Sequence, residues 1–333
     1  MYTNLTMHDE QIAEILKRFG LRDYAVSPPQ KGYRNTSYKV VSNAGIANLI
    51  IFKREAQALA TIRRADKFSH FLHEQGMPVR FRKHPPLLQI YGGTVPQYAG
   101  LYNYLPGATI PWEAYTKKHL KALGRSLAQL HQLARVYDAD DRVYVHQTMS
   151  TLIDTIERYC NQAGVRSAAK QKLGVVVEPK VYDRFRRLAA ALGESTQQQW
   201  LHMDFVRGNI LFSPQAHVCG IIDFEKASFG HPLFDVARTL AFLLVDCAYK
   251  EPQDVYRLFL EHGYQGRGRN LLPAVIFNGV DRTSDVLEAL TAFYMLHDYY
   301  KFLLYSPYES LGQNHHFTCT KAELLKRNVL TEI

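Results

Sequence analysis

An aspartate, an asparagine and a second aspartate follow one another at short spacing in the middle of the chain. The first segment reads His202-Met203-Asp204, and Asn209 comes five positions after Asp204. Asp223 comes 14 residues after Asn209 and follows the apolar run Gly220-Ile221-Ile222. A carboxylate can accept the proton of an attacking hydroxyl, and amide and carboxylate oxygens suit Mg²⁺. The spacing predicts phosphoryl transfer, with Asp204 as base or hydroxyl orienter and Asn209 and Asp223 as metal ligands.

The neighbouring polar residues have more than one interpretation. Arg207 lies inside the loop and either contacts phosphate or pairs with Asp204 and holds it. We interpret His202 as structural, with its imidazole bonded to backbone or to an acid. Asp235 either caps the helix that it begins or supports the loop. Glu225 is either a carboxylate beside the metal or a surface acid.

The residues before this segment predict a small lobe of strands and turns. Apolar spacing predicts helices over 8–20 and 55–75. Alternating runs predict strands over 38–41, 48–53, 88–91 and 98–102. The small and polar residues of 31–37, ahead of the first strand, could bring backbone N–H groups and hydroxyls close to phosphates, although a plain hairpin loop has the same composition. The break at Pro106-Gly107 marks the predicted boundary. We therefore expect a nucleotide-binding lobe over 1–102 and a hinge over 103–107.

The remaining residues, 108–333, predict a larger helical lobe that carries catalysis and substrate binding. Helical spacing is strongest over 116–133, and helices are also expected over 148–163, 181–193, 235–244 and 284–305. His131 lies on the apolar face of the first of these, and we expect it to be a hydrogen-bonded core residue. Strands followed by helices make the fold class α+β.

The composition of the chain bears on the compartment in which it is expected and on the partners that it is expected to bind. The 333 residues are 47% hydrophobic and 21% charged, as in soluble globular proteins. The four cysteines form no C-x-x-C pair, and the N-terminus has no signal-peptide pattern, so a cytoplasmic protein is expected. The net charge of +9 is spread over many segments without a binding motif, which argues against a nucleic-acid partner and fits a phosphate-binding cleft. The sequence does not indicate the oligomeric state.

Several motifs together resemble the aminoglycoside phosphotransferase and choline kinase family, which also includes homoserine-kinase-like members. The match rests on His202 to Leu211, Ile221 to Glu225, and Phe229 to Ala237. Upstream, Leu123 to His131 is similar to the family's "ALG…LA.LH" helix, and Gly76-Met77-Pro78-Val79 is similar to its "G-x-P-V" turn. The family usually has Gly before its catalytic Asp, where this chain has Met203. The resemblance spans about residues 30–245.

The resemblance implies a bilobal protein-kinase-like fold that binds ATP and Mg²⁺. It implies that Asp204 is the catalytic Asp, that Asn209 and Asp223 bind the metal, and that adenine meets backbone near Tyr102 to Leu105. The implied nucleotide-binding residues are Gly32, Asn35, Thr36, Ser37, Lys53, Tyr102, Asn103 and Tyr104. Lys53 is assigned as the phosphate cation, although the family's pattern points nearer Ile50 or Ile51. Its acidic partner is Glu55, Asp66 or Glu74.

The acceptor is expected to be a small hydroxyl compound. A protein of charge +9 without an acid-rich C-terminal segment suits a neutral or anionic acceptor better than a polycationic aminoglycoside. One alternative is a pseudokinase-like module that binds nucleotide or a partner without turnover. It is considered because Lys53 lies beyond the position at which the family's pattern places the strand cation. Another is a metal-dependent phosphohydrolase that uses Asp204 and Asp223.

Overall fold

A computed structural model describes residues 9–31, 35–84, 86–91, 94–247, 251–266, 272, 274–277 and 280–332. The chain divides into two compact units. The first contains residues up to Ala108 together with Cys219–Lys226, and the second contains Thr109–Val218 and the residues from Ala227 onward. The predicted hinge at 103–107 lies just before the first change of unit, and its role as a hinge stays a prediction.

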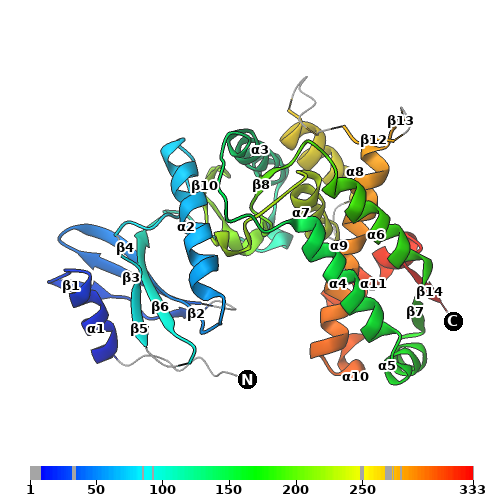
Figure 1. The fold of residues 1–333 in the computed structure, drawn as a ribbon, viewed down its shortest axis with the longest axis horizontal. Coiled ribbons are helices and arrows are strands. Elements are labelled where there is room, and N and C mark those ends of the chain that lie inside the picture. The colour runs from blue at the N-terminus through cyan, green and yellow to red at the C-terminus, as the bar shows by residue number, and fades with distance from the viewer. Residues whose placement is uncertain are drawn as a thin grey trace. The chain divides into compact units, whose positions relative to one another are not determined.

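The first unit is built on an antiparallel sheet with strand order β1-β3-β4-β6-β5 and with β2 beside β3 (Figure 1). Its strands are β1 (Tyr24–Val26), β2 (Gln30–Lys31), β3 (Thr36–Ser42), β4 (Gly45–Ile51), β5 (Leu88–Tyr91) and β6 (Gln97–Asn103). Its helices are α1 (Asp9–Arg18) and α2 (Ala58–Glu74). The unit also receives most of β10 (Val218–Ile221) and the short helix η4 (Phe224–Lys226) from later in the chain. The long predicted elements are confirmed, whereas the short strands β1 and β2 were not predicted.

The two faces of the sheet bury different side chains of β4. Leu49 and Ile51 pack with the α1 residues Ile12 and Leu16. Ile50, one position along, packs in the other cluster with Ile62 of α2. This is the alternation expected of a strand that is covered on both faces. The expected strand to Lys53 is too long, because β4 ends at Ile51 and Lys53 lies beyond it.

The second unit is mainly helical. Its longer helices are α3 (Lys117–Ala134), α4 (Val145–Cys160), α6 (Lys180–Gly193), α7 (Leu233–Asp246), α9 (Thr283–Tyr305) and α11 (His315–Lys326). The shorter helical segments are η1 (Trp112–Ala114), α5 (Ala163–Ala168), η2 (Ala169–Leu173), η3 (Arg207–Asn209), α8 (Pro252–Val255), η5 (Tyr256–Tyr264) and α10 (Tyr308–Leu311). The strands are β7 (Val175–Val177), β8 (Gln199–Leu201), β9 (Ile210–Phe212), β11 (Ser228–Gly230), β12 (Ile276–Phe277), β13 (Val280–Asp281) and β14 (Leu330–Glu332).

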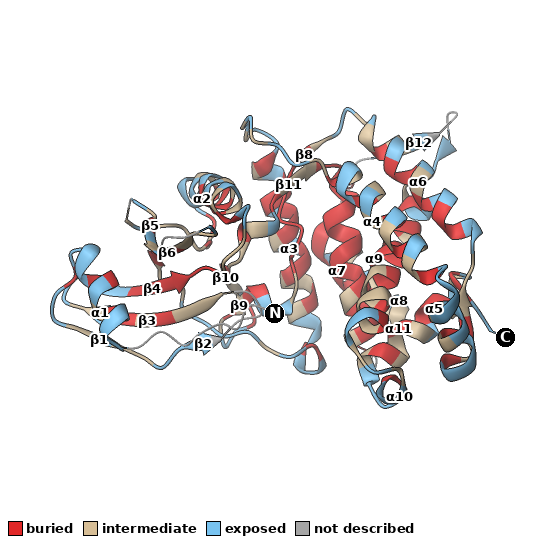
Figure 2. Ribbon diagram, turned by 60° about the horizontal axis from the view of Figure 1, so that its bottom comes forward, coloured by how far each residue is buried: buried red, intermediate tan, exposed pale blue. Residues whose placement is uncertain are grey.

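Helix α7 lies at the centre of the second unit and is buried along almost its whole length (Figure 2). It packs against α9 and α11. The strand β8 pairs antiparallel with β11, and the residues that follow β8 are hydrogen-bonded to Asp235 in the first turn of α7. The loop that follows β8 carries Asp204, so a short sheet and a buried helix position the candidate catalytic residue.

Helix α3 approaches η5 so closely that a side chain at Gly124 would not fit. A Cβ atom there would lie 2.1 Å from the carbonyl oxygen of Phe259 and 2.7 Å from the backbone nitrogen of Tyr264. Glycine is required at this position for close backbone packing rather than for a special φ angle. The contact brings Tyr264 beside His131, which lies on the same helix face as Gly124 two turns later.

Candidate active site

The loop after β8 is held by backbone hydrogen bonds to a carboxylate of α7. The N–H groups of His202 and Met203 each donate to Asp235, over 2.8 Å to Oδ2 and 2.8 Å to Oδ1 respectively. Asp235 is fully buried in the first turn of α7. Of the two roles considered for Asp235, the structure shows support of the loop.

Met203 adopts a left-handed backbone conformation, with φ of 59°. This conformation costs a residue with a side chain about 1 kcal/mol or more and is readily adopted by glycine. The geometry explains why glycine is favoured before the aspartate of this motif. Asp235 accepts the hydrogen bonds of the His202 and Met203 N–H groups, and these bonds offset the backbone strain at Met203.

His131 is a buried, hydrogen-bonded core residue, as expected. Its Nε2 lies 3.2 Å from Asp235 Oδ2, and its Nδ1 lies 2.5 Å from the hydroxyl of Tyr264. His202 is also structural, because its Nδ1 accepts the N–H of Asp204 over 3.1 Å. The histidines near the loop therefore orient it, and neither is assigned a proton-transfer role.

Both carboxylate oxygens of Asp204 have fixed partners. Arg238 Nη2 donates to Oδ1 over 2.9 Å, and Asn209 Nδ2 donates to Oδ2 over 2.9 Å. Burial lowers the pKa of Arg238, but the charge and hydrogen bond of Asp204, together with Tyr294 and Asp235, outweigh it and raise the pKa, so the guanidinium keeps its charge. Arg238 was missed in the sequence, where an arginine inside the apolar run of α7 was the available signal. The ion pair with Arg238 and the hydrogen bond from Asn209 fix the direction of the Asp204 carboxylate.

Asn209 is oriented in a way that suits a metal ligand. Its Nδ2 donates to both the backbone oxygen and Oδ2 of Asp204, each over 2.9 Å. With the amide nitrogen used in this way, the carbonyl oxygen Oδ1 is the donor that Asn209 can offer to a cation. Within the described ranges, no three His, Cys, Asp or Glu side chains gather to hold a metal ion. Amide and carboxylate oxygens of the Asn–Asp type are ligands that suit Mg²⁺.

Asp223 belongs to the first unit and lies in a strained backbone conformation just after β10. Its φ is 63°, in the left-handed region, which is uncommon outside glycine and is concentrated at functional sites. The end of β10 is bonded to the segment after α2, because Ile221 N donates to the carbonyl of Pro78 and Arg80 N donates to the carbonyl of Ile221. Burial lowers the pKa of Arg80 to about 10, while the negative charge of Asp223 opposes the shift. Arg80 is a second cation that sequence analysis did not select.

The predicted phosphate-binding loop is anchored by Asn35. Its Oδ1 accepts the backbone N–H of Lys53 over 3.1 Å, and its Nδ2 donates to Glu225. Thr36 and Ser37 begin β3 opposite Ile51 and Ile50 of β4. Gly32 lies outside the described residues. Glu225 is thus bonded to the predicted phosphate loop two positions after Asp223.

Among the described residues of the first unit, Lys53 and Arg82 each pair with an acid. Lys53 Nζ lies 3.4 Å from Glu55, and both side chains are about one-third exposed. Asp66 of α2 instead pairs with Arg82, 3.0 Å away, and accepts the Tyr102 hydroxyl over 2.8 Å. Burial raises the pKa of Asp66 to about 6, against the lowering effect of Arg82.

Asn103 uses its side chain inside the first unit. Its Oδ1 accepts the N–H of Phe81 over 2.8 Å, and its Nδ2 donates to the carbonyl of Val79 over 3.1 Å. The Tyr102 side chain is buried and directed at Asp66. Tyr104 is more exposed and lies under the Lys39 ammonium, 5.0 Å from the ring centroid. The part of this segment that could meet a nucleotide base is therefore backbone and the Tyr104 ring.

A hollow of about 680 Å³ lies beside the loop after β8 within the second unit. Its walls come from η1, from Val206 to Gly208 of the loop, from the end of α7 and from the start of α11. Charged side chains on these walls include Glu113, Arg207 and Asp246. Arg207 is exposed and shares this hollow with Gly208. The volume is that of a site for a small molecule.

His316 joins two carboxylates at the edge of this hollow. Its Nδ1 is bonded to Asp246, and its Nε2 lies 2.6 Å from Asp298 Oδ2. Burial lowers the pKa of His316, but the hydrogen bonds from Asp246 and Asp298 outweigh it and raise the pKa to about 9. The same imidazolium lowers the pKa of Asp298 against the effect of burial. Both shifts favour the imidazolium form of His316 and the carboxylate form of Asp298 at neutral pH.

Replacing His316 by glutamine is expected to lower stability in a pH-dependent way. The folded-state pKa of about 9 lies above the ordinary value of 6.5. The stabilisation is therefore complete below about pH 6.5 and is lost as the pH rises through about 9. We expect urea unfolding to show a deficit of up to about 3 kcal/mol at pH 6 that shrinks by pH 10.

The exposed neighbour His315 provides the matched control, since His315→Gln makes the same chemical change one residue away. A deficit for His316→Gln that is equal at pH 6 and pH 10 would show that the imidazolium is not the stabilising form.

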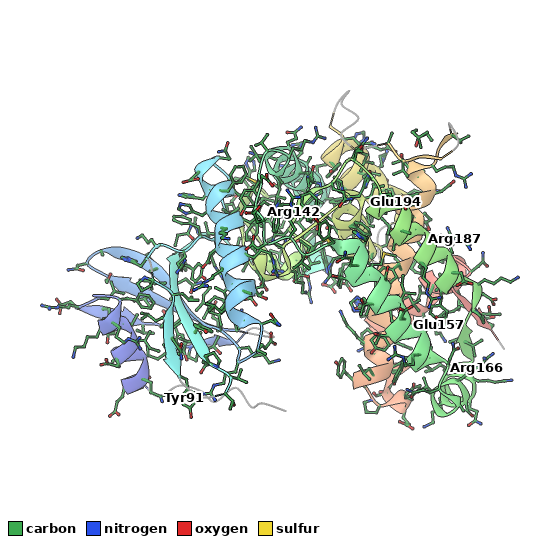
Figure 3. All side chains as sticks on the ribbon, in the orientation of Figure 1. Tyr91, Arg142, Glu157, Arg166, Arg187 and Glu194 are labelled. Atoms are coloured by element: carbon green, nitrogen blue, oxygen red, sulfur yellow. The ribbon has the colours of Figure 1, made fainter. Side chains whose placement is uncertain are left out.

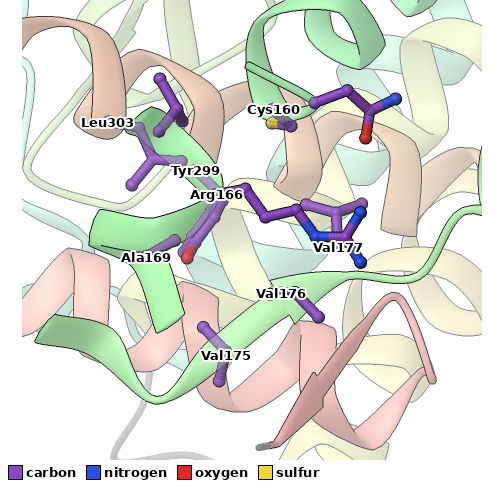
Figure 4. Close-up of a pocket in the computed structure, with 10 residues that line it drawn as sticks. Cys160, Arg166, Ala169, Val175, Val176, Val177, Tyr299 and Leu303 are labelled. Carbon is purple, nitrogen blue, oxygen red and sulfur yellow. The ribbon is translucent and has the colours of Figure 1, made fainter. Parts of the chain in front are cut away.

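A second cavity of about 20 Å³ lies between α4 and β7 and has Cys160, Arg166 and Tyr299 among its lining residues (Figure 4). This volume is close to that of one water molecule. Burial raises the pKa of the Cys160 thiol to about 11, so the thiol is protonated and unreactive at neutral pH. The cavity is a packing feature of the helical unit.

Exposed charges of both signs are spread over the outer helices of the second unit. Arg166 on α5, Arg187 on α6 and Glu194 at the end of α6 are exposed and are labelled in Figure 3. On α4 and α6, Arg186 binds Asp154 over 2.8 Å and also Glu157. Interspersed charges of this kind contribute little to stability and support solubility. No helix within the described ranges has the length and apolar composition needed to cross a membrane.

Comparison with known proteins assigns these features to a family. Residues 25–272 match the model of the phosphotransferase enzyme family (APH). A hydroxylysine kinase of Danio rerio is 22% identical over 261 residues, which cover 71% of this chain and 70% of that protein.

Solved structures share the fold at low sequence identity. An amicoumacin kinase in complex with AMP-PNP, Ca²⁺ and Ami has a TM-score of 0.67 at 16% identity, with coverage of 96% of this chain and 94% of that one. A thermostable mutant of aminoglycoside phosphotransferase APH(4)-Ia has a TM-score of 0.60 at 13% identity, with coverage of 94% and 98%. A spectinomycin phosphotransferase, APH(9)-Ia, in complex with ADP and spectinomycin has a TM-score of 0.57 at 16% identity, with coverage of 95% and 94%. The expected protein-kinase-like α+β fold, with an antiparallel N-terminal sheet and a larger helical part, is confirmed.

Proposed function

The chain belongs to the phosphotransferase enzyme family, and we propose that it transfers the γ-phosphate of ATP to a hydroxyl group of a small molecule in a Mg²⁺-dependent reaction. The observation that carries this proposal is Asp204, whose buried carboxylate is fixed by Arg238 on one oxygen and by Asn209 on the other. Transfer to a hydroxyl requires a pre-oriented carboxylate, and residues 206–208 of the loop that carries Asp204 line the small-molecule hollow.

In the proposed reaction the acceptor oxygen forms a bond to the γ-phosphorus as the bond from that phosphorus to the leaving ADP oxygen breaks. The acceptor hydroxyl gives up its proton to Asp204, and the proton then leaves to solvent. Arg238 holds the Asp204 carboxylate in place through its ion pair, and Asp235 keeps the loop in place. Arg207, which faces the hollow, is proposed to contact the phosphate that is being transferred.

Asn209 and Asp223 are the proposed Mg²⁺ ligands, and bound Mg²⁺ would neutralise charge on the phosphates. We expect chelation by EDTA to abolish ATP consumption and excess Mg²⁺ to restore it. Asp223→Ala should reduce turnover by at least about a hundredfold with excess Mg²⁺ present, because a carboxylate ligand is lost. Turnover that persists in EDTA would contradict metal dependence.

Lys53 is proposed as the cation that binds the nucleotide phosphates. Arg82, which pairs with Asp66, is the cation with which it is compared. Lys53→Met is expected to raise KM for ATP by about tenfold, since it removes one charge-assisted contact, and to leave stability unchanged. Arg82→Met is expected mainly to lower the melting temperature, because it leaves the Asp66 carboxyl buried without its cation. If Arg82→Met raises KM for ATP and Lys53→Met does not, the phosphate cation is Arg82. Steady-state kinetics and thermal unfolding of both variants decide this.

The proposed nucleotide site also uses Asn35, Thr36 and Ser37 beside the phosphates, with Gly32 in the same loop. The backbone of Tyr102, Asn103 and Tyr104 is proposed to meet the adenine. The internal hydrogen bonds of the Asn103 side chain support a backbone role for this segment. The divisions into a nucleotide-binding lobe over 1–102, a hinge over 103–107 and a catalytic lobe over 108–333 are part of the same proposal.

The acceptor is proposed to be neutral or anionic overall rather than polycationic. The net charge of +9 and the positive Arg207 in the hollow both oppose a polycation. The name of the hydroxylysine kinase relative is consistent with a small hydroxylated acceptor.

The decisive experiment measures ATP consumption and acceptor phosphorylation across a panel of hydroxylated metabolites, with Asp204→Asn as the inactive control. A clear preference for a polycationic antibiotic would contradict the proposed acceptor class. Nucleotide binding without turnover would support a pseudokinase-like module, and phosphate release without an acceptor product would support a phosphohydrolase.

A further inference from the structure

The strand β4 brings no cation of its own to the face of the sheet that packs on α2. Asn48 and Ile50 share this face, since alternate residues of a strand point to the same side. The family's pattern places a cation nearer Ile50 or Ile51, but β4 contains no Lys or Arg. Lys53 lies beyond the end of β4, where its partly exposed ammonium pairs with Glu55. The face therefore presents a buried amide where a strand cation is expected.

That amide, on Asn48, holds a guanidinium from another segment. Asn48 is only 7% exposed and lies opposite Tyr102 in the sheet. In the orientation that satisfies both ends of the amide, Oδ1 accepts from Arg80 Nη2 over 3.0 Å and Nδ2 donates to the carbonyl of Tyr38 over 3.1 Å. Arg80 thus reaches the face on which β4 has no cation.

The backbone of Arg80 is joined to the strand that leads to Asp223. Val79 and Ile221 form a parallel bridge, and Arg80 N donates to the carbonyl of Ile221 over 2.8 Å. Asp223 follows two positions later, and its negative charge opposes the lowering of the Arg80 pKa by burial. The pKa of about 10 leaves the guanidinium charged at neutral pH. The first unit therefore places a cation on the side of the proposed metal ligand.

Arg80 retains donors that a ligand can use. Its Nε is buried and has no hydrogen-bond partner among the described residues. Asn48 is a neutral partner and cannot balance the positive charge. Arg82, two positions along the chain, is instead paired with the carboxylate of Asp66 over 3.0 Å. A buried donor without an acceptor is costly, and the arginine fork matches the geometry of phosphate oxygens. The environment of Arg80 is therefore suited to an anion.

We propose that Arg80, positioned by Asn48, binds the nucleotide phosphates on the side of Asp223, as a second cation in addition to Lys53. The inference rests on the proposed function and adds a residue to its nucleotide site. Arg80 donates hydrogen bonds to phosphate oxygens and keeps its protons, so it takes no part in proton transfer. Asn48 does not touch the nucleotide and acts through Arg80.

The first test separates the phosphates from the base. Kd values for ADP and for adenosine are measured by calorimetry on wild type and Arg80→Met, once with Mg²⁺ and once with EDTA. We expect Arg80→Met to raise Kd for ADP by at least about tenfold in both conditions, the loss of one charge-assisted contact, and to leave Kd for adenosine unchanged. An equal change for ADP and adenosine would overturn the inference. A loss that appears only with Mg²⁺ would also overturn it, because Arg80 would then act through Asp223.

The second test separates binding from a structural role. Arg80→Lys keeps the charge without the fork and is expected to recover part of the lost affinity for ADP. Asn48→Ala should raise Kd for ADP severalfold, and the double variant Asn48→Ala with Arg80→Met should be no worse than Arg80→Met alone. Arg82→Met should lower the melting temperature and leave Kd for ADP nearly unchanged. Arg63→Met, at an exposed position of α2, is the control and should change neither quantity.

The proposed function and this inference fail in different ways. If wild type binds ADP and transfers phosphate while Arg80→Met leaves Kd for ADP unchanged, the proposed function holds and the role of Arg80 is wrong. If Arg80→Met does not fold, unchanged affinity for ADP in both Arg80→Lys and Asn48→Ala overturns the role of Arg80. If wild type binds neither ATP nor ADP, the proposed function fails and the role of Arg80 fails with it.

Discussion

Replacing Asp204 by asparagine is expected to lower the rate of phosphate transfer by about a thousandfold while the chain still folds. Asparagine has the same shape, so it can keep its place between Arg238 and Asn209. It cannot accept the proton of the acceptor hydroxyl, and it presents no negative charge. The expected effect is therefore on kcat, with KM for ATP changed far less.

The same variant should be less stable. Arg238 is only 8% exposed and would lose the carboxylate that offsets its burial. We expect a loss of about 1–3 kcal/mol, measured by urea unfolding. Asp140→Asn makes the same change at an exposed loop position and serves as the control for both measurements. Transfer by Asp204→Asn within tenfold of the wild-type rate would refute the assigned role of Asp204.

Removing the carboxylate of Asp235 should give the largest loss of stability of any change considered. Asp235→Ala would leave the N–H groups of His202 and Met203 and the ring of His131 without their buried acceptor. The expected cost is about 3–5 kcal/mol, a large part of the 5–15 kcal/mol typical of a folded domain. Thermal unfolding followed by calorimetry measures it.

Asp235→Asn provides a second measurement if the alanine variant does not fold. The amide oxygen can still accept one of the two N–H groups, whereas the amide nitrogen faces the other as a second donor. We expect a smaller loss of stability together with reduced transfer, because the loop that carries Asp204 is no longer fixed. Asp285→Ala is the matched control, since Asp285 also lies in the first turn of a helix but is exposed and paired only with Arg282 among the contacts seen. Equal losses at the two positions would contradict the bracing role of Asp235.

The candidate active site could be predicted from the sequence as far as local chemistry and chain order determine it. Asp204, Asn209 and Asp223 stand at spacings that the chemistry of phosphoryl transfer accounts for, and the family match supports the same interpretation. The helices were predictable because their apolar spacing extends over many residues. The ends of short strands were not, because β4 stops at Ile51 while the apolar pattern continues to Phe52.

Only the tertiary structure decided which side chains hold these residues. Arg238 meets Asp204 across 34 positions of sequence, and Asp235 meets the loop across 32 and 33 positions. Arg82 meets Asp66 through the packing of α2 beside the sheet, and His316 joins Asp246 to Asp298 where three helices meet. No rule of sequence spacing predicts such partners, because the packing of the helices and the sheet brings them together. The sequence by itself thus indicated the candidate reacting groups, and the fold determined their direction and support, because these depend on neighbours that are distant along the chain.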